Sequence, residues 1–154
     1  MTDPSVVALQ DQAKAADADF LRTLDEAGIA VRQHSDAGPV ARAVIYRMHV
    51  GIAAGGLKVC GHVAADRTEP AAWYAHRADT WACTGCHGQV LEPEVCDHCG
   101  DDLDTRHVVC VHLSPPASTT AVNPPLLIVM TLCAKCAAVN DIHDQPDETD
   151  DPGR

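Results

Sequence analysis

Three Cys-x-x-Cys pairs are the residues of this chain best suited to chemistry. They are Cys83/Cys86, Cys96/Cys99 and Cys133/Cys136. Two residues between two cysteines allow a tight backbone turn that directs both sulfur atoms at one tetrahedral metal ion. Each pair supplies only half of a four-coordinate site, so other residues must complete the set. The spacing therefore predicts a structural zinc protein with further ligands elsewhere in the chain.

Two Cys-x-His motifs offer these further ligands, which makes five half-sites in all. In chain order, half-sites 1 to 5 are Cys60/His62, Cys83/Cys86, Cys96/Cys99, Cys110/His112 and Cys133/Cys136. Two complete sites leave one half-site over, and three pairings are open. The first pairing joins half-site 1 with half-site 2, and half-site 3 with half-site 5. The second pairing joins half-site 1 with 2, and half-site 4 with 5. The third pairing joins half-site 2 with 3, and half-site 4 with 5.

The local chemistry of the turns favours the first pairing. Zinc knuckles need tight turns, often with glycine, so that backbone N–H groups can point at sulfur. Gly61 and Gly100 meet this need in half-sites 1 and 3, whereas Cys110 lies in a β-branched run typical of a continuous strand. A buried cysteine and a hydrogen-bonded histidine are ordinary in such a strand. The preferred ligands of two Zn²⁺ ions are Cys60, His62, Cys83, Cys86, Cys96, Cys99, Cys133 and Cys136.

Disulfides and redox chemistry are the main alternatives to metal binding. The first residues, MTDPSVVALQDQ, have neither the basic nor the apolar region of an export signal, so we expect a reducing, cytoplasmic location. The segment from Trp81 to Cys86 is similar to a thioredoxin-like active site. However, its tryptophan is one residue too far from the first cysteine, and no βαβ pattern surrounds it.

The sequence also argues against an enzyme. A catalytic zinc needs an open coordination position, and neither HExxH nor the deaminase signature of His-x-Glu followed by Pro-Cys-x-x-Cys occurs in the chain. The one candidate nucleophile is Cys110, with His112 or His107 as its base. His87 and His98, beside the knuckles, are candidates for substitute ligands or for donors to the ligands.

Net charge favours a protein partner over nucleic acid. Residues 1–80 carry 8 Lys/Arg against 10 Asp/Glu, whereas residues 81–154 carry 3 against 12, which gives the chain its net charge of −11. Nucleic-acid binding depends on Lys and Arg contacts to phosphate. We therefore expect a non-enzymatic adaptor or regulator. The alternative is a nucleic-acid-associated regulator that uses Arg32, Arg42, Arg47, Lys58, Arg67 and Arg77.

The pattern of elements predicts a small zinc-stabilised α+β fold. Residues 1–56 are predicted to form an N-terminal segment of two helices, which end at Gly28 and at Gly55-Gly56. We expect these two helices to form a hairpin, which could pair with another copy of the chain. Residues 57–143 read as the double zinc module, with strands at 70–74, 107–113 and 126–132 and a short helix at 134–139. The longest apolar run is too short to cross a membrane. Residues 144–154 form an acidic tail that we expect to be disordered.

Two resemblances accompany these motifs. Residues 81–103, with CTGC, nine residues, CDHCG and then Asp-Asp-Leu, resemble the zinc-ribbon modules of many bacterial proteins, which implies the third pairing. The wider order of Cys-x-His, Pro-Ala-x-Trp, CxxC, CDxCG, a strand and Leu-Cys-x-x-Cys is similar to small zinc proteins of actinobacteria and their phages, which implies the first pairing. A knuckle, a hairpin and a CxxC that opens a helix is also the layout of a treble clef.

Overall fold

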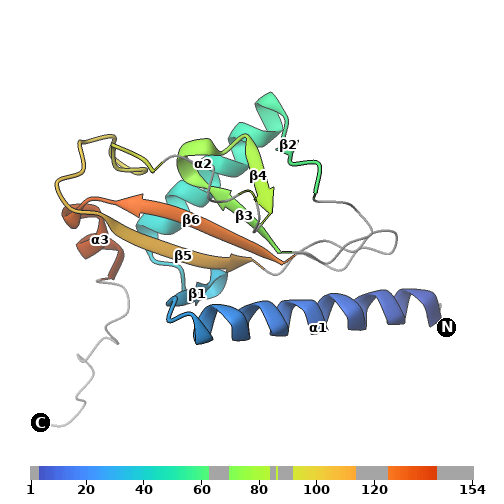
Figure 1. Ribbon diagram of the computed structural model, residues 1–154. Helices are drawn as coiled ribbons and strands as arrows, with labels where there is room; N and C mark the ends of the chain where they lie inside the picture. Colours follow the sequence, from blue (N-terminus) through green and yellow to red (C-terminus); the bar gives the residue numbers. More distant parts are fainter. Residues whose placement is uncertain (1–3, 63–69, 84–85, 87–91, 114–124, 142–154) are drawn as a thin grey trace, which may run out of the picture.

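The computed structural model describes residues 4–62, 70–83, 86, 92–113 and 125–141. These residues form three α-helices and one six-stranded mixed sheet (Figure 1), which confirms the predicted α+β class. The helices are α1 (Pro4–Glu26), α2 (Pro39–Gly55) and α3 (Ala134–Asp141). The strands are β1 (Val31–Gln33), β2 (Lys58–Val59), β3 (Ala71–Tyr74), β4 (Thr80–Cys83), β5 (His107–Leu113) and β6 (Leu126–Leu132).

The sheet is built around the predicted hairpin of β5 and β6. The strand order is β1-β5-β6-β3-β4-β2, with β5 and β6 antiparallel along all seven residues. β1 lies parallel to β5, β3 parallel to β6, and β2 parallel to β4. β6 is buried along most of its length, in keeping with its run of apolar residues, LLIVMTL. The short strands β1, β2 and β4 carry no strong sequence signal and were not predicted.

The larger core lies between the sheet and α2. Val44 and Met48 of α2 pack with Trp73, Ile128 and Met130 from the same face of the sheet. Successive residues along a strand point to opposite faces. Val109, Val111 and Leu113 of β5 and every second residue of β6 therefore face this core. The segment from Pro39 to Gly55 is a helix, as predicted, because its buried residues follow a helical and not a strand period.

α1 packs on the other face of the sheet, so the predicted helical hairpin is wrong. Phe20 and Leu24 of α1 contact Cys110 and Leu127, which point away from α2. The chain leaves α1 at Gly28, whose φ of 72° suits glycine, and then enters β1 at the edge of the sheet. β1 and the 3₁₀ turn that follows it, His34–Asp36, carry the chain from one face to the other.

The short helix α3 connects the end of the hairpin to the start of α2. The Asn140 Oδ1 accepts a hydrogen bond of 2.9 Å from the Ala41 N–H in the first turn of α2. α2 therefore belongs to the same packed unit as β5, β6 and α3. The domain boundary at residue 56 stays a prediction, and the acidic tail lies outside the described residues. None of the helices in the described ranges combines the length and apolar character needed to cross a membrane.

Candidate metal centres

The first candidate centre lies where β2 and β4 end. These two strands are parallel, so their carboxyl ends meet at one edge of the sheet. Cys60 directly follows β2, and Cys83 is the last residue of β4. Half-sites 1 and 2 thus come together through a strand pairing that spans more than twenty residues of sequence. We call the group of Cys60, His62, Cys83 and Cys86 the first centre.

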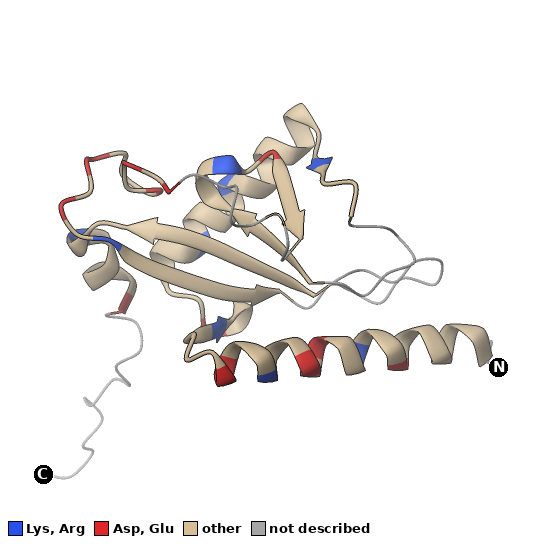
Figure 2. Ribbon diagram, in the orientation of Figure 1, with Lys and Arg blue, Asp and Glu red and all other residues tan. Residues whose placement is uncertain are grey.

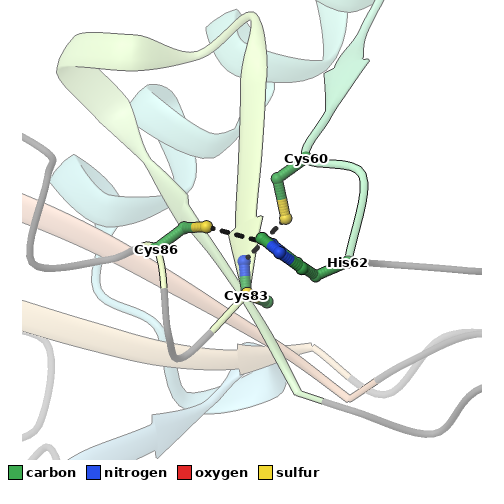
Figure 3. A group of neighbouring side chains, drawn as sticks. All are labelled: Cys60, His62, Cys83 and Cys86. Carbon is green, nitrogen blue, oxygen red and sulfur yellow. Dashed lines mark hydrogen bonds between the residues drawn. The ribbon is translucent and has the colours of Figure 1, made fainter.

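Four ligand atoms converge in the first centre (Figure 3). One donor atom from each residue lies within 4.8 Å of every other. The Cys86 Sγ is 3.3 Å from the His62 Nδ1, and the Cys83 N–H points at the Cys60 Sγ over 3.3 Å. The Cys86 N–H also donates to the Cys83 carbonyl at 3.0 Å, which forms the tight turn of a Cys-x-x-Cys knuckle. This set of one nitrogen and three sulfurs is suited to one tetrahedral metal ion.

The second candidate centre joins a knuckle to the end of the β5–β6 hairpin. It consists of Cys96, Cys99, Cys133 and Cys136, whose sulfur atoms all lie within 4.8 Å of one another. In the knuckle, the Gly100 N–H donates to the Cys96 carbonyl at 3.0 Å, and the φ of Gly100 is 78°. Cys133 follows β6 directly, and Cys136 lies in the first turn of α3.

The distances of the second centre fit tetrahedral coordination by sulfur. Bonds of about 2.3 Å to a central zinc ion place neighbouring sulfurs roughly 3.8 Å apart. The Cys99 and Cys133 sulfurs are separated by 3.8 Å. The Cys133 N–H points at the Cys96 Sγ over 3.3 Å, which repeats the arrangement of Cys83 and Cys60 in the first centre. In both centres the cysteine at or directly after the end of a strand donates its N–H to the first sulfur of the other half-site.

The thiols in each centre lie so close together that the ionisation of one disfavours the ionisation of its neighbours. Burial disfavours the Cys96 thiolate, but hydrogen bonds from the backbone N–H groups around it, beginning with that of Cys99, lower its pKa to about 7. In contrast, burial and hydrogen bonds to the neighbouring thiols raise the pKa of Cys136 well above its usual range. In the first centre, hydrogen bonding to Cys83, with burial, raises the pKa of Cys86 to about 11. A divalent ion supplies the charge that lets several adjacent thiolates coexist.

The second centre is tied to the hydrophobic core by polar contacts that sequence reasoning missed. The Thr131 N–H donates to the Asp97 carboxylate at 2.7 Å, and the Asp97 N–H donates to the Thr131 carbonyl at 2.9 Å. The Arg47 guanidinium on α2 donates to the carbonyls of Asp97 and His98. The knuckle is thereby anchored to both β6 and α2. Nothing in the spacing of Asp97 or Arg47 marks these roles, because each partner is distant in sequence.

Half-site 4 joins neither centre. Cys110 and His112 lie on the face of β5 that α1 covers, both in buried positions. The two ring nitrogens of His112 are engaged by the Asp17 carboxylate at 2.5 Å and by the Gln33 side-chain oxygen at 3.0 Å. Burial raises the pKa of the Cys110 thiol. The residues are therefore placed as the buried strand residues that the sequence suggested, and the His112 contacts with α1 and β1 were not foreseen.

The remaining candidate residues are dispersed. His98 is not one of the grouped donors, and His87 lies outside the described residues. Of the six cations named for nucleic-acid binding, Arg67 also lies outside them. Arg32 pairs with Asp141, Arg42 donates to the Ser35 carbonyl, and Lys58 lies 3.8 Å from Asp79. With Arg47 bound to the knuckle, four of the six cations make contacts within the protein, and Arg77 is exposed. This arrangement adds no support for a phosphate-binding surface.

No protein-family model, curated protein or solved structure matches this chain. The resemblances to zinc ribbons and to small actinobacterial zinc proteins therefore stay predictions. The structural evidence that bears on function is the geometry of the two centres.

Proposed function

We propose that this protein is a non-enzymatic adaptor or regulator whose two zinc sites are structural and hold a surface for a protein partner. The observation that carries the proposal is the presence of two separate four-donor groups, each closed within 4.8 Å. Sets of Cys₃His and Cys₄ are typical of structural zinc, because they fill all four coordination positions. A filled site leaves no position for a substrate or for a reactive water molecule.

We infer that the second centre is a treble clef. Its elements follow in the order knuckle, hairpin and helix, with Cys96 and Cys99 in the knuckle and Cys133 and Cys136 at the start of α3. The first centre would hold the ends of β2 and β4 together and has no helix of its own. In this interpretation zinc replaces part of the hydrophobic core of a chain with few aromatic residues.

The surroundings of Cys110 support a role other than catalysis. Its thiol is buried, its pKa is raised by burial, and the two nitrogens of the nearest candidate base, His112, are engaged by Asp17 and Gln33. A nucleophilic cysteine needs the opposite conditions, namely access, a lowered pKa and a base within hydrogen-bonding reach. A binding protein with two structural metal sites accounts for both centres and requires no active site.

Native mass spectrometry of the reduced protein tests the proposal directly. We expect two zinc ions per chain, with one lost in Cys60→Ser and both kept in Cys110→Ser. The second substitution is a control, because Cys110 is a cysteine that belongs to neither centre. A wild-type count of one or none, or loss of an ion in Cys110→Ser, would refute the two-site assignment.

A further inference from the structure

The four cysteines of the second centre differ in how far solvent reaches them. Cys99 is exposed and Cys133 is half-buried, whereas Cys96 and Cys136 are 2% and 8% exposed and belong to the main hydrophobic core. The two more accessible cysteines come from different half-sites, because Cys99 lies in the knuckle and Cys133 directly after β6. Oxidation of cysteine follows thiolate character and exposure. A dissolved oxidant therefore meets one cysteine from each half-site.

A cavity of about 200 Å³ makes the Cys133 side of the centre accessible. The cavity is lined by Cys133 itself, by Asp101, Asp102 and Asp104, and by Lys135 on α3. Figure 2 shows the acidic residues along the segment that leads into β5. Three carboxylates against one ammonium group repel an anionic oxidant such as oxidised glutathione. A small uncharged oxidant, of which hydrogen peroxide is the simplest, is the class that this surface admits.

The two accessible sulfur atoms are also close enough to react with each other. The Cys99 and Cys133 sulfurs are 3.8 Å apart, and a disulfide bond requires about 2.05 Å. All sulfurs of a tetrahedral centre lie at similar separations, so accessibility and not distance selects this pair. The Cys96 sulfur is held in the core by a further contact, since it accepts the Cys133 N–H over 3.3 Å. Joining Cys99 to Cys133 therefore disturbs the core least.

The oxidation of this pair by peroxide is a two-electron reaction. The Cys99 thiolate attacks one peroxide oxygen, so that an S–O bond forms, the O–O bond breaks, and the leaving hydroxide takes up a proton to become water. The Cys133 thiolate then attacks the sulfur of the resulting sulfenic acid, which forms the S–S bond and releases the second oxygen as water. Two thiolates are oxidised, one peroxide is reduced to two water molecules, and two protons are consumed.

A disulfide between Cys99 and Cys133 joins the same two segments that the metal ion joins. The hydrogen bonds between Asp97 and Thr131 hold the knuckle beside β6 without help from the ion. A disulfide within either Cys-x-x-Cys pair would instead leave the knuckle and the hairpin without a link. Only a bond between the half-sites can replace the ion as a connection.

We propose that the second centre is a redox-sensitive joint, in which a small neutral peroxide converts Cys99 and Cys133 to a disulfide, the zinc ion is released, and the knuckle stays connected to the end of β6. This inference rests on the proposed function, which supplies the bound ion, and it names the regulation of the second site. Only Cys96 and Cys136 then remain as ligands, which is half of a tetrahedral set. Zinc release signals oxidation, while the fold that carries the partner surface is kept.

Limited oxidation of the reduced, zinc-loaded, full-length protein tests the inference. The protein is treated with one equivalent of hydrogen peroxide, and native mass spectrometry counts the ions. We expect the loss of one zinc ion and a chain two hydrogens lighter than the reduced chain. Oxidised glutathione at the same concentration should leave both ions bound over the same time. Equal release by the two oxidants would overturn the assignment to a neutral peroxide.

Peptide mapping without reducing agent locates the disulfide. Trypsin cleaves after Arg106 and Lys135, which places Cys99 and Cys133 in separate peptides and also divides the last Cys-x-x-Cys pair. The expected bond joins the two peptides on either side of Arg106, and fragmentation identifies its cysteines. A bond within a Cys-x-x-Cys pair would close one peptide on itself or join the peptides on either side of Lys135. Either of these results overturns the inference.

Near-UV circular dichroism distinguishes replacement of the ion from its simple loss. Peroxide-treated protein should keep the signal of the buried Trp73, because the disulfide still joins the knuckle to the hairpin. Chelated, reduced protein has neither link and should lose this signal. Cys110→Ser is the control and should match the wild type in both treatments, because Cys110 belongs to neither centre. Loss of the Trp73 signal after peroxide would overturn the inference.

The metal count separates failure of this inference from failure of the proposed function. Reduced protein that holds two ions and keeps both after peroxide would refute the redox-sensitive joint and leave the structural zinc sites standing. Reduced protein that holds one ion or none would refute the proposed two-site function, and the joint with it. Release of one ion with a Cys99–Cys133 bond and an intact core supports both proposals.

Discussion

At the scale of single residues, the contact between Gly38 and Asn140 has the clearest consequence for stability. Gly38 stands at the N-cap of α2 and has no side chain to cap the helix. Asn140, on α3, supplies the missing acceptor to the Ala41 N–H. The approach is so close that a Cβ on residue 38 would collide with the carbonyl oxygen and the side chain of Asn140. Residue 38 must therefore be glycine, because Asn140 leaves no space for a side chain there.

We expect Asn140→Ala to lower the free energy of unfolding by about 1–2 kcal/mol, the usual value of a helix cap. Gly38→Ala should destabilise the protein by more, because backbone atoms of α3 must move away. Urea denaturation of zinc-loaded protein measures both effects. Val139→Ala, at an exposed position of the same helix, serves as control. A loss in Asn140→Ala no larger than that in Val139→Ala would show that the cap itself contributes little.

Cys110 offers a second residue-scale prediction, concerning thiol reactivity. Because its thiol is buried and burial raises its pKa, it should resist iodoacetamide at neutral pH in the folded protein and react after denaturation. Cys110→Val, of similar size, should leave the zinc count unchanged. Mass spectrometry of labelled peptides gives the result. Rapid labelling of Cys110 in the native protein would contradict its placement and restore it as a candidate nucleophile.

At the scale of elements, α1 is held to the sheet by a small contact area near its C-terminal end. Phe20 and Leu24 are its two buried residues, and the pair of Asp17 with His112 adds a polar contact one turn earlier. Figure 1 shows the rest of this long helix extending along one side of the molecule. Helices of this kind depend on tertiary packing for their stability. The attachment of α1 is thus separable from the metal centres.

Phe20→Ala should detach α1 and cost about 3 kcal/mol or more, as expected for truncation of a buried phenylalanine. The zinc count should stay at two, because neither centre contacts this face of the sheet. Hydrogen exchange should rise throughout α1 and stay unchanged in β6. Val7→Ala, at an exposed position of the same helix, is the matched control. Loss of zinc in Phe20→Ala would show that α1 supports the centres after all.

At the scale of the whole molecule, the two candidate centres join different parts of the fold. The first holds β2 and β4 at one edge of the sheet. The second joins the knuckle to β6 and α3, and from there Arg47 and Asn140 connect it to α2 and the main core. A structural zinc ion contributes on the order of 10 kcal/mol to folding. The consequences of losing each ion should therefore differ in extent.

We expect Cys136→Ser to unfold the core and abolish the near-UV signal of the buried Trp73, whereas Cys86→Ser should expose only the β2–β4 edge. Cys136 is buried beside the core, and Cys86 is partly exposed. Hydrogen exchange followed by mass spectrometry distinguishes local from global loss. Removal of both ions with a chelator should unfold the core, as in Cys136→Ser. Similar behaviour of the two variants would mean that the centres form one cooperative unit.

Much of this molecule follows from short-range patterns that the sequence alone contains. The Cys-x-x-Cys spacing defines its own tight turns, and glycines with positive φ end α1 and α2 where the sequence places them. β5 and β6 were predicted with correct bounds, because apolar, β-branched runs of seven residues are distinctive. These features depend on residues a few positions apart. For the same reason the eight preferred donors could be named from their residue types and spacing.

Only the tertiary structure decided which half-sites meet, since pairing depends on contacts across more than twenty residues. The sequence left three pairings open, and the parallel register of β2 with β4 and the position of the knuckle beside β6 bring together the first. Tertiary contacts also placed α1 and α2 on opposite faces and buried His112 between Asp17 and Gln33. Short strands such as β1 and β2 exist because their neighbours complete them, and no local preference reveals them.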